Sequence, residues 1–94
     1  MTKVSFVCPI FNKNNYLSLV LSSIKNQVGG FEKEFIFIDD GSTDGSLDTL
    51  KKKTSKWKNT IILRQENKGP AVATQNGISR ATGNFIKLVG GDDI

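Results

Sequence analysis

The sequence predicts an α/β fold built on a parallel sheet, and three observations support this prediction. Short apolar runs with strand-like composition alternate with helical patterns in the order βαβαβαβ. Each strand is joined to the next through a helix, which indicates parallel strands and right-handed crossovers. The run at residues 35–38 is wholly aromatic or β-branched, as in strands buried on both faces. With 94 residues, the chain is one domain or part of one.

The first strand and helix follow from an apolar run and a helical repeat. A strand is predicted over residues 3–8, ending at Pro9, because proline cannot donate a hydrogen bond within a central ladder. The asparagine-rich segment 9–15 offers both a turn and a helix cap. Apolar residues then recur at helical spacing, which predicts an amphipathic helix ending at Gly29-Gly30: Leu17, Val20, Leu21, Ile24 and Val28.

The rest of the chain repeats this alternation. Strands are predicted over residues 34–39, 60–64 and 85–89, and helices over residues 44–53 and 71–81. The last helix is made of small residues, which permits a close approach to the sheet or to a ligand. Trp57 lies in a lysine-rich connector, where we expect it to cover the sheet edge rather than to contact a ligand.

Pairs of carboxylates follow two of the predicted strands. Asp39-Asp40 follow the second strand and Asp92-Asp93 follow the fourth. If the strands lie in the order 3-2-1-4, the order reverses between the first and fourth strands, and open α/β sheets bind ligands at such switch points. The loop 9–12 and Asp92-Asp93 would flank this point, with Asp39-Asp40 one strand away. We therefore expect three polar segments to converge at one edge of the sheet.

These acids allow three interpretations. They could be solvated loop residues, general acid or base groups, or ligands of a hard divalent cation. Mg²⁺ or Mn²⁺ would be the natural ion, because the chain has no histidine and a metal would be held by oxygen. Gly90-Gly91, just before the last acids, leaves room for a bulky ligand and favours a binding role.

Several other functional classes lack their sequence signals. Residues 8–13 contain no glycine, so the GxGxxG turn is absent, and Lys68-Gly69 does not form a Walker A loop. The single cysteine, Cys8, excludes an internal disulfide and is expected to be a small buried hydrophobe. No run reaches transmembrane length. The net charge of +4 owes much to the lysines of segment 51–58, which we interpret as a solvated helix end in preference to an anionic-membrane patch, and we expect no nucleic-acid partner.

Four motifs, in their order and spacing, resemble the family 2 glycosyltransferases of GT-A fold. They are residues 4–12 (VSFVCPIFN), 37–44 (FIDDGSTD), 66–69 (ENKG) and 81–93 (ATGNFIKLVGGDD). The resemblance covers essentially all 94 residues. It implies the amino-terminal, nucleotide-sugar-binding half of a Rossmann-like GT-A domain over residues 1–94, with four parallel strands in the order 3-2-1-4.

The resemblance also implies roles for the residues that match the motifs. Pro9, Phe11 and Asn12 would line the nucleoside pocket. Asp40 would contact the base or the ribose, and Asp39 would support the end of the strand. These five residues form the expected nucleotide-binding set, together with Asp92.

The expected metal site lies on the last acids. Asp92 and Asp93 fall on the Asp-x-Asp region of the family. Asp93 would ligate the Mn²⁺ or Mg²⁺ bound to the donor diphosphate, and Asp92 would contact the ribose or donor sugar beside it. The family often has another acid where Gly90 stands and an Arg-Asn pair where Thr74-Gln75 stand. Because that acid is replaced by Gly90, we expect fewer direct metal ligands here than is usual. Because that pair is replaced as well, we expect a cationic contact to the donor to be missing or to come from Arg80 or Lys68.

The implied activity is the transfer of a sugar from a nucleotide-diphosphate sugar, with UDP expected, to a saccharide or lipid-linked acceptor. The implied setting is cell-surface polysaccharide synthesis in the cytoplasm, at the inner face of the membrane. The acceptor site and catalytic base are expected beyond residue 94, so these residues would bind the donor, be inactive alone and self-associate through an exposed fourth strand. Two other classes remain open: a non-catalytic nucleotide-binding or receiver-like regulatory module, and an interaction domain with solvated acids.

Overall fold

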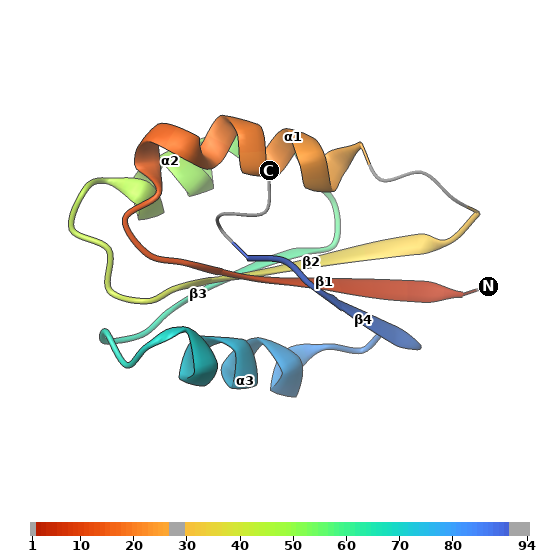
Figure 1. Cartoon of the computed structure of the whole chain (residues 1–94). Coiled ribbons are helices and arrows are strands. Elements are labelled where there is room, and N and C mark those ends of the chain that lie inside the picture. Colours follow the sequence, from red (N-terminus) through yellow and green to blue (C-terminus); the bar gives the residue numbers. More distant parts are fainter. Residues whose placement is uncertain (1, 27–29, 91–94) are drawn as a thin grey trace.

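The chain folds into a four-stranded parallel sheet with helices on both faces (Figure 1). The computed structural model describes residues 2–26 and 30–90. The strand order is β3-β2-β1-β4, so the predicted fold class and strand order are both confirmed. The elements, in chain order, are β1 (Lys3–Ile10), a 3₁₀ turn η1 (Asn14–Tyr16), α1 (Leu17–Lys25), β2 (Glu32–Asp39), α2 (Ser46–Lys53), β3 (Thr60–Arg64), α3 (Pro70–Arg80) and β4 (Phe85–Leu88).

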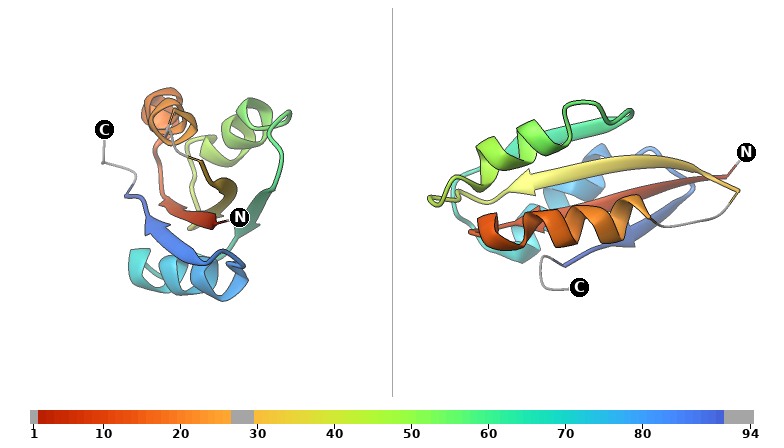
Figure 2. Two further views of the ribbon diagram at one scale, coloured as in Figure 1. Left: turned by 90° about the vertical axis from the view of Figure 1, so that its right-hand side faces the viewer. Right: turned by 90° about the horizontal axis from the view of Figure 1, so that it is seen from above.

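The sheet divides the apolar core into two layers, and helices cover both faces (Figures 1 and 2). Helices α1 and α2 cover one face, where alternate residues of β1 and β2 are buried together with the apolar stripe of α1. Helix α3 covers the other face, where it packs on the side chains of β1 and β2 that point away from α1 and α2. The larger layer contains Phe6, Cys8, Ile10, Leu17, Val20, Leu21, Ile24, Phe35, Phe37, Leu50 and Val89, and the smaller one contains Val7, Ile36, Ile38 and Ala73.

The first strand is longer than predicted, because Pro9 lies inside β1. The carbonyl of Val7 accepts a hydrogen bond from the N–H of Val89, so Val7 faces β4. Pro9, two residues further on, faces the same side but lies beyond Leu88, where β4 ends. A missing N–H therefore costs no ladder bond at this position. The other end of the first helical prediction, Val28-Gly29, lies outside the described residues.

Helix α3 approaches the sheet closely, as its small residues predict. A Cβ placed on Gly77 would lie 2.6 Å from Cδ1 of Ile38 and would also collide with Cγ1 of Val7. Ala73, one turn earlier, is completely buried. The absence of a side chain at Gly77 thus sets the distance between α3 and the sheet.

A buried glutamate connects three segments at the edge where the strands begin. Glu34 accepts hydrogen bonds from Ser5 Oγ (2.6 Å), and from the N–H and the hydroxyl of Thr82 (both 3.0 Å). The ammonium of Lys3 lies 3.8 Å from Oε1 of Glu34. Burial alone raises the pKa of Glu34, but these donors and the lysine outweigh burial and leave that pKa below the ordinary value.

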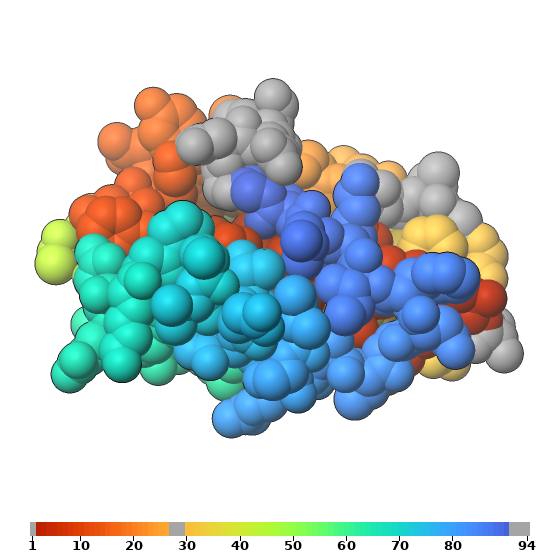
Figure 3. All heavy atoms as spheres, turned by 60° about the horizontal axis from the view of Figure 1, so that its bottom comes forward, coloured from red at the N-terminus to blue at the C-terminus, as the bar shows by residue number. Residues whose placement is uncertain are grey.

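Strand β4 exposes apolar side chains at one border of the sheet. Phe85, Ile86 and Leu88 are 65%, 43% and 54% exposed, and in the described part of the chain β4 pairs with β1 alone. Figure 3 shows this side of the molecule, with α3 and β4 at the surface. None of the helices formed by the described residues is long and apolar enough to cross a membrane.

Candidate functional site

The two aspartates that follow the second strand have different surroundings. Asp39 is completely buried, and its Oδ2 accepts a hydrogen bond from the N–H of Ser42 (3.1 Å) and lies 4.0 Å from Nη1 of Arg64. Its Oδ1 has no hydrogen-bond partner within the described part of the chain. Asp39 thus closes the turn after β2, and its part in nucleotide binding stays a prediction.

Asp40 is the acid that reaches the pocket at the carboxyl ends of the strands. Its N–H donates to the carbonyl of Ile10 (2.8 Å), which holds the residue beside the end of β1. Its Oδ1 accepts hydrogen bonds from the side chain of Gln65 and from the N–H of Lys68 (both 2.8 Å), and its Oδ2 accepts one from the N–H of Gly69 (3.0 Å). Burial by itself raises the pKa of Asp40, but these three donors lower it below the ordinary value. Asp40 is therefore an anion at neutral pH.

Gln65 belongs to a short chain of side-chain hydrogen bonds that ends at Asp40. The amide of Asn76, on α3, donates to Oε1 of Gln65, and Nε2 of Gln65 donates to Asp40. Because its oxygen is already occupied by Asn76, the Gln65 amide presents its nitrogen to the carboxylate. Neither Gln65 nor Asn76 was predicted as a site residue, since their contact depends on how α3 lies on the sheet and not on local spacing.

A pocket of about 380 Å³ opens beside Asp40. The residues that line it come from the ends of β1 and β2, from the loop between β3 and α3, and from the segment after β4: Pro9, Ile10, Phe11, Lys13, Asp40, Asn67, Gly69, Pro70 and Gly90. Three predicted nucleotide-binding residues, Pro9, Phe11 and Asp40, are thus brought together. Gly90, the last described residue, reaches the same pocket.

Asn12 does not line this pocket but holds two of its loops together. Its backbone has a positive φ of 49°, its N–H donates to Oγ of Ser42 (2.9 Å) and its Oδ1 accepts from the N–H of Thr43 (2.8 Å). Asp44 acts in a similar way, because its carboxylate accepts from the N–H groups of Asn14 and Ser46 (both 3.0 Å). The loops after β1 and β2 are therefore fastened to each other.

Gly41 brings the turn after β2 against the loop after β3. Its φ is +77°, in the left-handed region, and a Cβ on this residue would lie 2.9 Å from the backbone nitrogen of Asn67. Asn67 and Gly69 belong to the ENKG motif, and neither was predicted as a site residue. The structure shows that this loop supplies both pocket wall and donors to Asp40.

The expected metal ligands, Asp92 and Asp93, lie outside the described residues. Within residues 2–26 and 30–90, no group of three or more His, Cys, Asp or Glu side chains could hold a metal ion. The predicted role of Asp92 and Asp93 therefore stays a prediction, as does the contact of Asp92 with the nucleotide.

The fold and the pocket together define a Rossmann-like α/β domain. Its pocket extends from the switch point between β1 and β4, where such folds bind ligands, to the anionic carboxylate of Asp40 beside β2. Residues 5–94 match the model of the family described as "Glycosyl transferase family 2", and the chain belongs to this family.

Known proteins of the same kind agree with this assignment. The chain is 35% identical over 94 residues to a poly(ribitol-phosphate) beta-glucosyltransferase of Bacillus spizizenii, covering 97% of this chain and 15% of that protein. It superposes on S. aureus TarS 1–349 in complex with UDP-GlcNAc with a TM-score of 0.81 and 26% identity, covering 98% of this chain and 27% of that one. The mannosyltransferase PcManGT of Pyrobaculum calidifontis, in complex with GDP-Man and Mn²⁺, has the same fold (TM-score 0.86, 21% identity, 97% and 28% covered). The chain therefore spans about a quarter or less of the length of these proteins.

Proposed function

We propose that this chain binds the nucleotide-sugar donor of a glycosyltransferase that moves a sugar from a UDP-sugar to a saccharide or lipid-linked acceptor. The observation that carries the proposal is the Asp40 carboxylate, held as an anion in a pocket at the sheet switch point. The likeness to TarS, whose structure contains UDP-GlcNAc, supports a uridine nucleotide. The name of the Bacillus spizizenii relative supports a role in the synthesis of a cell-surface polymer. We assign this synthesis to the cytoplasmic side of the membrane, where nucleotide sugars are used.

Asp40 has the hydrogen-bonding capacity that nucleoside recognition needs. An ionised carboxylate offers about four acceptor positions. Gln65, Lys68 and Gly69 occupy three of them, two on Oδ1 and one on Oδ2. The position left on Oδ2 can accept an N–H of a pyrimidine base or a ribose hydroxyl. A base that donates to this carboxylate must therefore lie inside the pocket.

The remaining pocket residues suit the rest of a nucleoside diphosphate. Pro9 and Phe11 offer apolar surface to the base, and Gly69 leaves the backbone open to close approach. Lys13 brings a cation to the same wall, where it offsets the charge of a diphosphate. We assign Asp93, with Asp92 beside it, to hold Mg²⁺ or Mn²⁺ on that diphosphate, because carboxylates suit these ions and because the chain reaches the pocket at Gly90. Such a cation neutralises the charge that develops on the departing nucleoside diphosphate.

Calorimetric titration of the protein with UDP, UDP-GlcNAc and GDP, with and without Mn²⁺, tests this proposal. Asp40→Asn should weaken UDP binding by roughly tenfold or more, because the hydrogen bond to a charged acceptor is lost. Asp93→Ala should abolish the gain in affinity that Mn²⁺ produces. Asp48→Asn, an exposed acid in the first turn of α2, is the matched control and should change neither value.

Binding that ignores Mn²⁺ and both site substitutions would contradict the proposal. UDP binding that needs Asp40 but is unaffected by Mn²⁺ and by Asp93→Ala would instead favour a nucleotide-binding module without metal-assisted transfer.

A further inference from the structure

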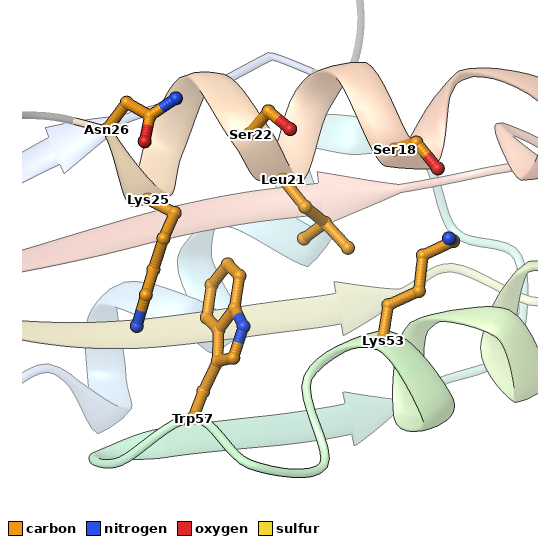
Figure 4. A pocket seen from close by; sticks show the side chains of 7 residues that line it. All are labelled: Ser18, Leu21, Ser22, Lys25, Asn26, Lys53 and Trp57. Carbon is orange, nitrogen blue, oxygen red and sulfur yellow. The ribbon is translucent and has the colours of Figure 1, made fainter.

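Lysines from separate segments converge around two adjoining hollows on the α1 and α2 side of the sheet. The first hollow, of about 290 Å³, is lined by Lys25 and Lys53 (Figure 4). The second, of about 470 Å³, is lined by Lys25, Lys33, Lys56 and Lys58. Lys25 is common to both, so the two hollows form one continuous region, which we call the basic surface. Its five lysines come from α1, β2, the end of α2 and the loop before β3.

Aromatic rings form the floor of the basic surface and hold one lysine in place. Figure 4 shows Trp57 between α1 and the loop that precedes β3, facing Lys25. The Lys25 ammonium lies 4.8 Å from the centre of the Trp57 ring and 5.8 Å from that of Phe35. Trp57 itself packs edge-on to Phe35, with centroids 4.9 Å apart, so the floor is anchored in the core.

Positive charge predominates in the lining of the basic surface. Among the described residues, no Asp or Glu lines either hollow. The nearest acids along the chain lie on the other face of the sheet or at the other end of α2. Glu32 and Glu34 alternate along β2 with Lys33 and Phe35, so they belong to the face that α3 covers. Asp48 lies in the first turn of α2, away from its lysine-rich last turn. Lys25, Lys53, Lys56 and Lys58 are all exposed. A ligand with spread negative charge would therefore meet a field of one sign.

The basic surface lies away from the candidate nucleotide pocket. The second hollow is lined by Phe31 and Asn59, which directly precede β2 and β3, so it lies where the strands begin. The pocket at Asp40 lies where the strands end. Both sites can thus be occupied at the same time, and the basic surface is not an extension of the donor site.

The charged residues of the surface are all lysines. Arginine is the side chain that recognises single phosphates in a bidentate manner, whereas lysine acts as a mobile point charge. Five lysines spread over two hollows, with half-buried Phe31 and Trp57 between them, match a broad anionic layer better than one phosphate group. Clusters of basic residues with interfacial aromatic rings are the features that attract proteins to anionic lipid surfaces.

We propose that the basic surface docks on a membrane that carries anionic phospholipids, with Lys25, Lys33, Lys53, Lys56 and Lys58 facing the lipid headgroups. This proposal replaces the interpretation of segment 51–58 as a solvated helix end, because the fold adds lysines from α1 and β2 to that segment. This docking leaves the pocket at Asp40 open to a soluble nucleotide sugar. It does not depend on the proposed transferase activity, because it follows from the charge of a different part of the molecule.

Co-sedimentation with vesicles tests the docking. Phosphatidylcholine vesicles with and without phosphatidylglycerol are mixed with the protein at about 0.1 M salt, where charges within roughly 10 Å still interact. The protein should sediment only with the anionic vesicles, and should be released when the salt is raised. Lys56→Gln/Lys58→Gln should lower the partition coefficient by roughly 20- to 30-fold, at about fivefold for each lysine near the surface.

A charge-matched variant makes the test specific. Arg80→Gln/Lys87→Gln removes the same charge from α3 and β4, on other parts of the surface, and should retain most of the vesicle binding. Equal losses in the two variants, or no binding to the anionic vesicles, would overturn the proposal. Release of the protein from vesicles by soluble polyphosphate at equal phosphate concentration, with tighter binding to the polyphosphate, would also overturn it and assign the surface to a soluble polyanion.

Discussion

Gln65 and Asp40 are joined by a hydrogen bond of 2.8 Å that connects the ends of two neighbouring strands through their side chains. The register of the sheet creates this contact, since Asp39 is opposite Arg64 and the next residue of each strand follows directly. The backbone adds a further bond, from the N–H of Gln65 to the carbonyl of Asp39 (3.0 Å). Gln65 is therefore a positioning residue for the carboxylate that we expect to meet the nucleoside.

Gln65→Leu should raise the pKa of Asp40 and weaken UDP binding by on the order of tenfold, because a donor to the ionised carboxylate is lost. A pH titration of the Asp40 carboxyl carbon by NMR measures the first effect, and calorimetry measures the second. Glu66→Gln changes the exposed neighbour and should affect neither quantity. An unshifted Asp40 titration in Gln65→Leu would show that the hydrogen bond has no role in holding the anion.

Gly77→Ala should destabilise the protein, although alanine is the better helix former. The added methyl group would press on Val7 and on Cδ1 of Ile38. Overpacking of this kind costs about 1–3 kcal/mol, against a helix-propensity gain of up to about 1 kcal/mol. Urea unfolding should thus show a net loss of about 1 kcal/mol, whereas Gln75→Ala, on the exposed side of the same helix, should be nearly neutral. A Gly77→Ala protein at least as stable as the wild type would refute the close contact.

The stability of the protein should fall as the pH drops through the acidic range. Glu34 has a pKa below its ordinary value in the folded state, so at acidic pH the unfolded chain binds more protons than the folded one. Its contribution is therefore present above about pH 4.3 and is lost as the pH falls through the folded pKa. Glu34→Gln should show a shallower loss of unfolding free energy between neutral and acidic pH. Glu32→Gln, at the exposed start of β2, serves as control and should keep the wild-type slope.

Strand β4 should cause self-association that depends on protein concentration. Its exposed apolar side chains and its outer backbone edge can pair with another chain. Leu88→Lys should reduce the association, because a charged side chain on an edge strand opposes such pairing. Sedimentation velocity over a range of concentrations measures the effect, with Leu19→Lys on α1, also exposed, as the matched control. A single monomeric species at every concentration would contradict the prediction.

The strand order, and the edge of the sheet at which the polar loops meet, could be predicted because they depend on the alternation of strands and helices and on the chirality of crossovers. The position of Pro9 could not be read from the same patterns, since its tolerance inside β1 depends on where β4 ends. The different surroundings of Asp39 and Asp40 depend on how the loop after β3 packs on the end of β2, and the nucleoside contact that the resemblance implies for Asp40 stays a prediction. The link from Asn76 through Gln65 to Asp40 was missed, because it joins residues whose contact depends on how α3 sits on the sheet.

The bare backbone at Gly77 has a consequence that reaches beyond folding. Its neighbour in sequence, Asn76, begins the series of hydrogen bonds that ends at the pocket. A change that increases the distance between α3 and the strands would break the hydrogen bond from Asn76 to Gln65. The Gln65 amide would then be less firmly oriented toward the Asp40 carboxylate. If the pocket binds a nucleotide as proposed, we therefore expect its affinity to depend on the close packing of α3 against Val7 and Ile38.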